Sequence, residues 1–136
     1  MRPTEQVKLE LVRQWLAKAD NDLETAKFLF ASGRPFFSAI CFHSQQAAEK
    51  YFKALLTWHQ IEFPKTHDLE LLLGLIASTD SALASSLTGV ALLNPYGVEI
   101  RYPGDFPETT DADAEEAMGL ADKVQEAIFL ALKDKA

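Results

Sequence analysis

Cysteine is almost absent from this sequence of 136 residues, because Cys41 is the only one. A single cysteine excludes an intramolecular disulfide and a zinc site built from cysteines. The three histidines, His43, His59 and His67, also lack the His-x-x-x-His spacing that places two metal ligands on one face of a helix. We therefore expect neither a metal site nor a cofactor.

Long apolar runs and an excess of basic residues are missing as well. The longest near-continuous apolar stretch, residues 69–77, is far shorter than the ~20 residues of a membrane span, and residues 1–8 hold no signal-peptide core. Thirteen Lys and Arg against twenty Asp and Glu give a formal net charge of −7. These features predict a cytoplasmic protein with no membrane association and no tight nonspecific binding to DNA.

Helical periodicity runs through most of the sequence. Apolar residues recur at steps of three and four, and turn signals separate the periodic segments. The pattern predicts helices over residues 5–31, 35–59, 68–77, 80–93 and 111–133. We expect Thr66 or His67 to cap the third helix, and Thr110 with Asp113 to form a capping box on the last. Long helices with short connections predict an all-α fold, an up-and-down helical bundle of four to five helices in a single domain, residues 1–136.

Residues 94–110 interrupt this periodicity. They hold three of the six prolines and two of the six glycines. A connection longer than ~12–15 residues inside a compact domain is uncommon and often functional. Its aromatic residues, Tyr96, Tyr102 and Phe106, predict an irregular segment that packs against the bundle or a partner.

One side of the helix predicted over residues 35–59 is polar. This side carries His43, Gln46, Glu49, Lys50, Lys53 and Thr57, opposite an apolar stripe that includes Cys41. The spacing of Gln46, Lys50 and Lys53 would allow all three to donate to one phosphate group. A solvated helix face without a ligand is the alternative interpretation.

The run from Cys41 to Leu56, CFHSQQAAEKYFKALL, resembles the signature helix of HEPN domains, the nucleotide-binding domains of higher eukaryotes and prokaryotes. Three more segments resemble parts of that family in the same order. They are the first helix with Trp15, Ala19, Asp22, Leu23 and Ala26, the start of the third helix at Thr66–Leu69, and Arg101-Tyr102-Pro103 ahead of the last helix. The resemblance covers nearly the whole chain.

The resemblance implies an all-α domain that is usually dimeric and often encoded beside a minimal nucleotidyltransferase, in a two-gene, toxin–antitoxin-like system. Many members of the family are ribonuclease toxins with an Arg-x(4–6)-His motif near the last helix. In this sequence no histidine follows Arg101. An arginine can stabilise phosphate charge but cannot act as a general base. We therefore expect a nucleotide- or RNA-binding module rather than an enzyme, with His43, Gln46, Lys50, Lys53 and Arg101 as its phosphate-binding residues.

Two other functions are compatible with the sequence. One is an atypical metal-independent ribonuclease that uses Arg101 with His43 or His67 as catalytic residues. The other is a protein-interaction bundle without a nucleotide site, in which Arg101 pairs with nearby carboxylates and His67 has a capping role.

We also expect a homodimer or a larger even oligomer. The resemblance implies this, and so does a surplus of apolar residues that a small bundle cannot easily bury. These residues are Phe28, Leu29, Phe42, Leu56 and Trp58.

Overall fold

The computed structural model describes residues 3–97, 104, 108–133 and 135, and over these residues the chain is helical and has no strand. The predicted all-α class is therefore confirmed. The elements are α1 (Pro3–Ala31), α2 (Phe37–Trp58), α3 (Leu69–Ala77), α4 (Ser81–Ser86), the 3-10 helix η1 (Thr88–Gly97) and α5 (Asp111–Ala131). Among the described helices, none has the length and apolar character needed to cross a membrane.

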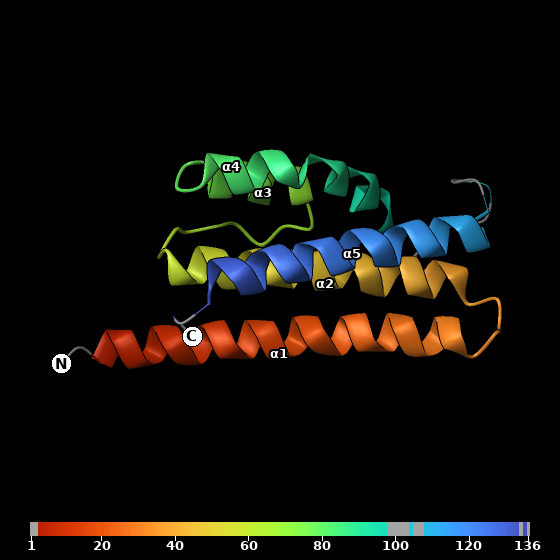
Figure 1. Ribbon diagram of the computed structural model, residues 1–136, viewed down its shortest axis with the longest axis horizontal. Coiled ribbons are helices and arrows are strands. Elements are labelled where there is room, and N and C mark those ends of the chain that lie inside the picture. Colours follow the sequence, from red (N-terminus) through yellow and green to blue (C-terminus); the bar gives the residue numbers. More distant parts are fainter. Residues whose placement is uncertain (1–2, 98–103, 105–107, 134, 136) are drawn as a thin grey trace.

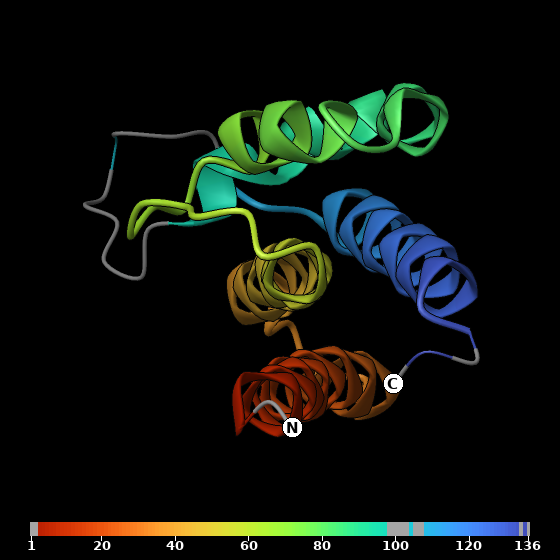
Figure 2. The same cartoon turned by 90° about the vertical axis from the view of Figure 1, so that its left-hand side faces the viewer.

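Helix α2 lies at the centre of the bundle. Figure 1 shows α1 and α2 antiparallel, with α5 running beside α2, and Figure 2 shows α3, α4 and η1 on the side of α2 opposite α1. Contacts join α2 to α1, α3, η1 and α5. Because it has neighbours on most sides, α2 buries polar residues, Ser44, Gln45, Glu49 and Lys53, together with its apolar stripe.

The helix predicted over residues 80–93 is shorter in the structure. Helix α4 ends at Ser86, and the chain continues as η1 to Gly97. Leu87, Val90 and Leu93 are buried at steps of three, which is the repeat of a 3-10 helix. This tighter winding places one apolar residue per turn against the core.

Two local predictions around α3 and α5 have different outcomes. The capping box of Thr110 and Asp113 is present at the start of α5. The cap of α3, however, is Asp68 and not Thr66 or His67: its carboxylate accepts from the backbone N–H groups of Glu70 and Leu71. An aspartate satisfies these free donors and also suits the positive end of the helix dipole.

The segment predicted to be irregular begins later than expected, because residues 94–97 belong to η1. Tyr96 is half-buried and packs against the core, as its aromatic character predicted. Tyr102 and Phe106 lie outside the described residues.

Candidate functional site

A carboxylate from α1 joins two of the predicted site residues on α2. The Asp22 Oδ1 atom accepts from His43 Nδ1 at 2.9 Å, and its Oδ2 atom accepts from Lys50 Nζ at 2.5 Å. The Asp22 side chain is only 11% exposed, whereas those of His43 and Lys50 are 30% and 22% exposed. One buried acceptor therefore holds two donors at the surface.

A second carboxylate, Glu49, binds the other two candidates on the opposite side of this face. Its Oε2 atom accepts from Lys53 Nζ at 2.8 Å, and its Oε1 atom accepts from His67 Nδ1 at the same distance. Glu49 is almost fully buried, while the His67 side chain is 64% exposed. His67 thus reaches from the start of α3 back to α2.

Lys53 is buried, although the sequence placed it on the polar side of its helix. Lys53 is 7% exposed and its ammonium lies near the rings of Trp15 and Phe63, at 5.4 and 5.8 Å from their centroids. Phe63 belongs to the segment between α2 and α3, which runs back along α2 (Figure 1). With Glu49 and two aromatic rings around it, the Lys53 ammonium is paired and largely shielded from solvent.

Two glutamines lie between the carboxylate clusters. Gln45 Nε2 donates to the His67 backbone carbonyl at 3.1 Å and to Glu49 Oε1 at 3.3 Å. Gln46 Nε2 donates to Gln45 Oε1 at 2.7 Å. Gly97 closes this region, because a Cβ atom there would lie 3.2 Å from both Gln45 Nε2 and His67 Cβ. The end of η1 is thus packed directly against the site.

The structure brings His43, Gln46 and Lys50 together on one half-exposed face of α2, and it places His67 next to Glu49. Arg101 lies outside the described residues. Sequence reasoning had not assigned Asp22 or Gln45 to the site. A signal was available for Asp22, since it is a charged residue close to the apolar stripe of α1.

A separate polar contact links α1, α2 and α5. The buried Tyr51 hydroxyl donates to Asp20 Oδ1, and Gln125 Nε2 donates to the Tyr51 hydroxyl at 2.9 Å. Burial, followed by the hydrogen bond to Asp20, raises the pKa of Tyr51 well above its usual range. This contact is therefore a structural one that keeps the phenol protonated.

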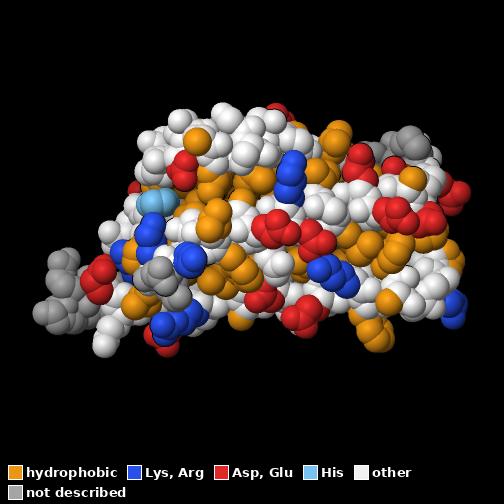
Figure 3. Space-filling model, viewed as in Figure 1, with side chains coloured by type: hydrophobic (Ala, Val, Ile, Leu, Met, Phe, Trp, Pro, Cys, Tyr) orange, Lys and Arg blue, Asp and Glu red, His pale blue; other side chains and the backbone are white. Residues whose placement is uncertain are grey.

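Positive side chains gather at the end of the molecule where the two termini lie (Figure 3). His59 belongs to this end, and burial together with the nearby Lys135 and Lys8 lowers its pKa. Lys8 is also engaged, because its ammonium lies 4.0 Å from the centroid of the Trp58 ring and 3.2 Å from Glu5.

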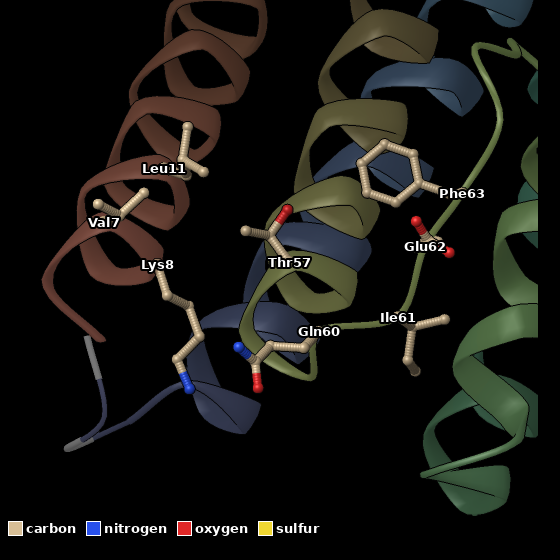
Figure 4. A pocket seen from close by; sticks show the side chains of 8 residues that line it. All are labelled: Val7, Lys8, Leu11, Thr57, Gln60, Ile61, Glu62 and Phe63. Carbon is tan, nitrogen blue, oxygen red and sulfur yellow. The ribbon is translucent and has the colours of Figure 1, made fainter. Parts of the chain in front are cut away.

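The same end carries an apolar groove between α1 and the residues that follow α2 (Figure 4). The groove has a volume of about 330 Å³ and is lined by Val7, Lys8, Leu11, Thr57, Gln60, Ile61, Glu62 and Phe63. Its lining includes none of the site residues predicted from the sequence. Within the described residues there is also no group of three or more His, Cys, Asp or Glu side chains suited to hold a metal ion.

Several segments of the chain resemble parts of the HEPN family in the same order, and a comparison of the whole sequence with known families agrees with this resemblance. The sequence model of the HEPN domain matches residues 12–133, nearly the whole chain. The chain belongs to the HEPN family. No relative of this HEPN domain was found among the curated proteins.

Two solved structures are similar to this HEPN domain. A crystal structure of an archaeal HEPN homologue is 26% identical in sequence, with a TM-score of 0.68, and the match covers 90% of this chain and 98% of the archaeal one. A protein from Thermus thermophilus is 28% identical, with a TM-score of 0.69, over 86% of this chain and 94% of its own. The bundle is thus shared with these two proteins over almost their full length.

Proposed function

We propose that this HEPN domain is a binding module that holds a phosphate group of a nucleotide or RNA on the face of α2 formed by His43, Gln46 and Lys50. The observation that carries the proposal is the position of Asp22, which binds His43 and Lys50 at the same time. An ammonium has three N–H donors, and Asp22 orients Lys50 through one of them. No other group in the described part of the chain takes up the remaining two, so they are available to a ligand at a half-exposed position.

The His43 ring adds a second donor to this arrangement. The Asp22 carboxylate can only accept, so His43 Nδ1 carries the hydrogen and Nε2 is the ring atom available to a ligand. A protonated imidazole would donate through Nε2 to a phosphate oxygen, and a charge-assisted bond of this kind is stronger than a neutral one.

Arg101 is proposed as a further phosphate ligand. The described residues before and after it contact α2, because Gly97 lies against Gln45 and Thr109 Oγ1 is 3.2 Å from Ser38 Oγ.

Lys50→Ala tests the phosphate site. We expect it to weaken binding of a 5′-phosphorylated oligoribonucleotide by about ten- to a hundredfold, because a charge-assisted contact worth ~1.5–3 kcal/mol is lost. The slope of log affinity against log salt should fall by about one, since one fewer counterion is released. Fluorescence anisotropy at several salt concentrations measures both quantities.

Lys18→Ala is the matched control, because it removes the same charge from an exposed position on α1. Equal affinities for the wild type and Lys50→Ala would show that the α2 face is a solvated surface without a ligand. Arg101→Ala is expected to weaken binding further in the Lys50→Ala background. Lys53→Ala is expected to act mainly on stability, because Lys53 is buried against Glu49.

A metal-independent ribonuclease is the second candidate, and the two imidazole–carboxylate pairs favour it. His43 and His67 each have Nδ1 bound to a carboxylate, which is the arrangement that orients a general base. Because no histidine follows Arg101, we expect the purified protein to show little RNA cleavage in the presence of EDTA. If the wild type cleaves RNA, and cleavage is lost in Arg101→Ala and in either His43→Ala or His67→Ala, the protein is a ribonuclease and not a binding module.

We propose that the module acts as a homodimer next to a minimal nucleotidyltransferase. Family membership supports this proposal, as does Phe28, which is 74% exposed on α1. Leu56, in contrast, is fully buried and offers no interface, contrary to expectation, while Leu29, Phe42 and Trp58 are half-buried. Light scattering at micromolar concentration, with and without the nucleotidyltransferase, tests both associations; a monomer under both conditions would contradict them.

A further inference from the structure

The hydrogen bonds around Gln46 determine which atom of its amide faces a ligand. The chain of bonds begins at the His67 carbonyl oxygen, which can only accept. Gln45 must therefore turn its Nε2 toward His67, and the Glu49 carboxylate accepts from the same nitrogen. The Gln45 Oε1 atom is then an acceptor, so Gln46 must donate to it through Nε2. The direction of every bond therefore follows from two groups that can only accept, the His67 carbonyl and the Glu49 carboxylate.

This chain of hydrogen bonds, from Gln46 through Gln45 to His67 and Glu49, leaves Gln46 Oε1 as a fixed acceptor on the face of α2. Gln46 is half-exposed, and no side chain or backbone group in the described part of the chain donates to its Oε1 atom. His43 lies three residues before it and Lys50 four residues after it on the same helix. Side chains at these spacings are neighbours, with Cβ atoms about 5–6 Å apart. A ligand whose phosphate is held by Lys50 and His43 would thus place its adjacent groups against Gln46.

From this geometry we infer that Gln46 is a specificity-determining residue that accepts a hydrogen bond from a ribose 2′-hydroxyl, so that the site selects ribonucleotides over deoxyribonucleotides. The inference rests on the proposed function, since it requires a phosphate on His43 and Lys50. In a nucleotide with a 3′-phosphate, the 2′-hydroxyl is the donor nearest to that phosphate, whereas the base edges lie farther away. The 2′-hydroxyl is also the group by which proteins distinguish RNA from DNA.

Three ligands separate the parts of this inference. Adenosine 3′-monophosphate and 2′-deoxyadenosine 3′-monophosphate differ only in the 2′-hydroxyl, and inorganic phosphate reports the cationic part of the site alone. Isothermal titration calorimetry is expected to show that the wild type binds the ribonucleotide roughly three- to tenfold more tightly than the deoxyribonucleotide, which is the effect of one net hydrogen bond. In Gln46→Leu the ribonucleotide should lose its advantage, so that the two nucleotides bind with equal affinity.

Gln45→Leu gives an independent test, because it acts on Gln46 only through the hydrogen bond between the two side chains. It leaves Gln46 in place but removes the acceptor that orients its amide, so the preference for ribose should decrease without being lost as fully as in Gln46→Leu. Circular dichroism confirms folding of each variant, and Gln46→Met serves if the leucine variant is unstable.

Two results would overturn the inference in distinguishable ways. If the wild type binds inorganic phosphate and both nucleotides with equal affinity, or if Gln46→Leu keeps the preference for ribose, the role of Gln46 is wrong and the phosphate site stands. If neither nucleotide nor phosphate binds, the proposed function fails and the inference fails with it.

Discussion

Glu49→Ala is expected to lower the free energy of unfolding by about 3–5 kcal/mol, because it leaves the Lys53 ammonium buried without its carboxylate. Glu49 and Lys53 are 3% and 7% exposed, so water cannot easily replace the lost partner. The change also removes an acceptor from His67 and Gln45. Urea unfolding followed by far-ultraviolet circular dichroism measures the loss.

Two further variants separate the buried charge from helix propensity. Glu24→Ala makes the same substitution at an exposed position of α1 and should change stability by no more than about 0.5 kcal/mol. The double variant Glu49→Leu with Lys53→Met removes the pair together and should recover much of the stability lost in Glu49→Ala. A double variant as unstable as Glu49→Ala would mean that the buried charge is not the cause.

Tyr51→Phe is expected to lower the free energy of unfolding by about 1.5–3 kcal/mol at neutral pH, because the hydroxyl that joins Asp20 to Gln125 is removed. The Asp20 carboxylate is then left with the 3.3 Å contact from Gln125 Nε2. The ring itself remains, and with it the edge-to-face packing against Phe129. The difference between the two proteins therefore reports the hydroxyl group.

This difference should depend on pH above the normal range of tyrosine. Burial and Asp20 raise the pKa of Tyr51 in the folded state, whereas in the unfolded chain the pKa of tyrosine is about 10. The folded state holds the proton more tightly, so the contribution of the hydroxyl is fully present below about pH 10 and decreases by about 1.4 kcal/mol per pH unit above it. Unfolding of both proteins at pH 8 and pH 11 tests this, and a difference that stays constant would contradict it.

Most helices could be predicted because their signals are local. Steps of three and four located α1, α2, α3 and α5 within a few residues, and Thr110 and Asp113 form the predicted capping box. Helix α4 was overextended for the same reason, since apolar spacing in residues 80–93 does not distinguish an α-helix from a 3-10 helix that packs Val90 and Leu93 inward. Asp68 was overlooked as a cap because the predicted helix began at residue 68, one residue before the start of α3.

The candidate site was predicted only in part. Periodicity placed His43, Gln46 and Lys50 on one face of α2, and the structure finds them there, half-exposed. The same periodicity placed Glu49 and Lys53 on that face, where the structure buries both. Angular position on a helix says which side chains are neighbours, but it does not say which other elements cover them.

The sequence by itself determined the helical class, the order of the long helices, the HEPN family and the polar character of α2, since each depends on residue types at short spacing. The tertiary structure alone decided which polar residues are exposed and which partners they have. Asp22 meets Lys50 from 28 residues away, and Glu49 meets His67 from 18 residues away, across α1 and α3. Such pairs depend on how helices pack and how the segment after α2 returns along it, and no local pattern in the sequence records that path.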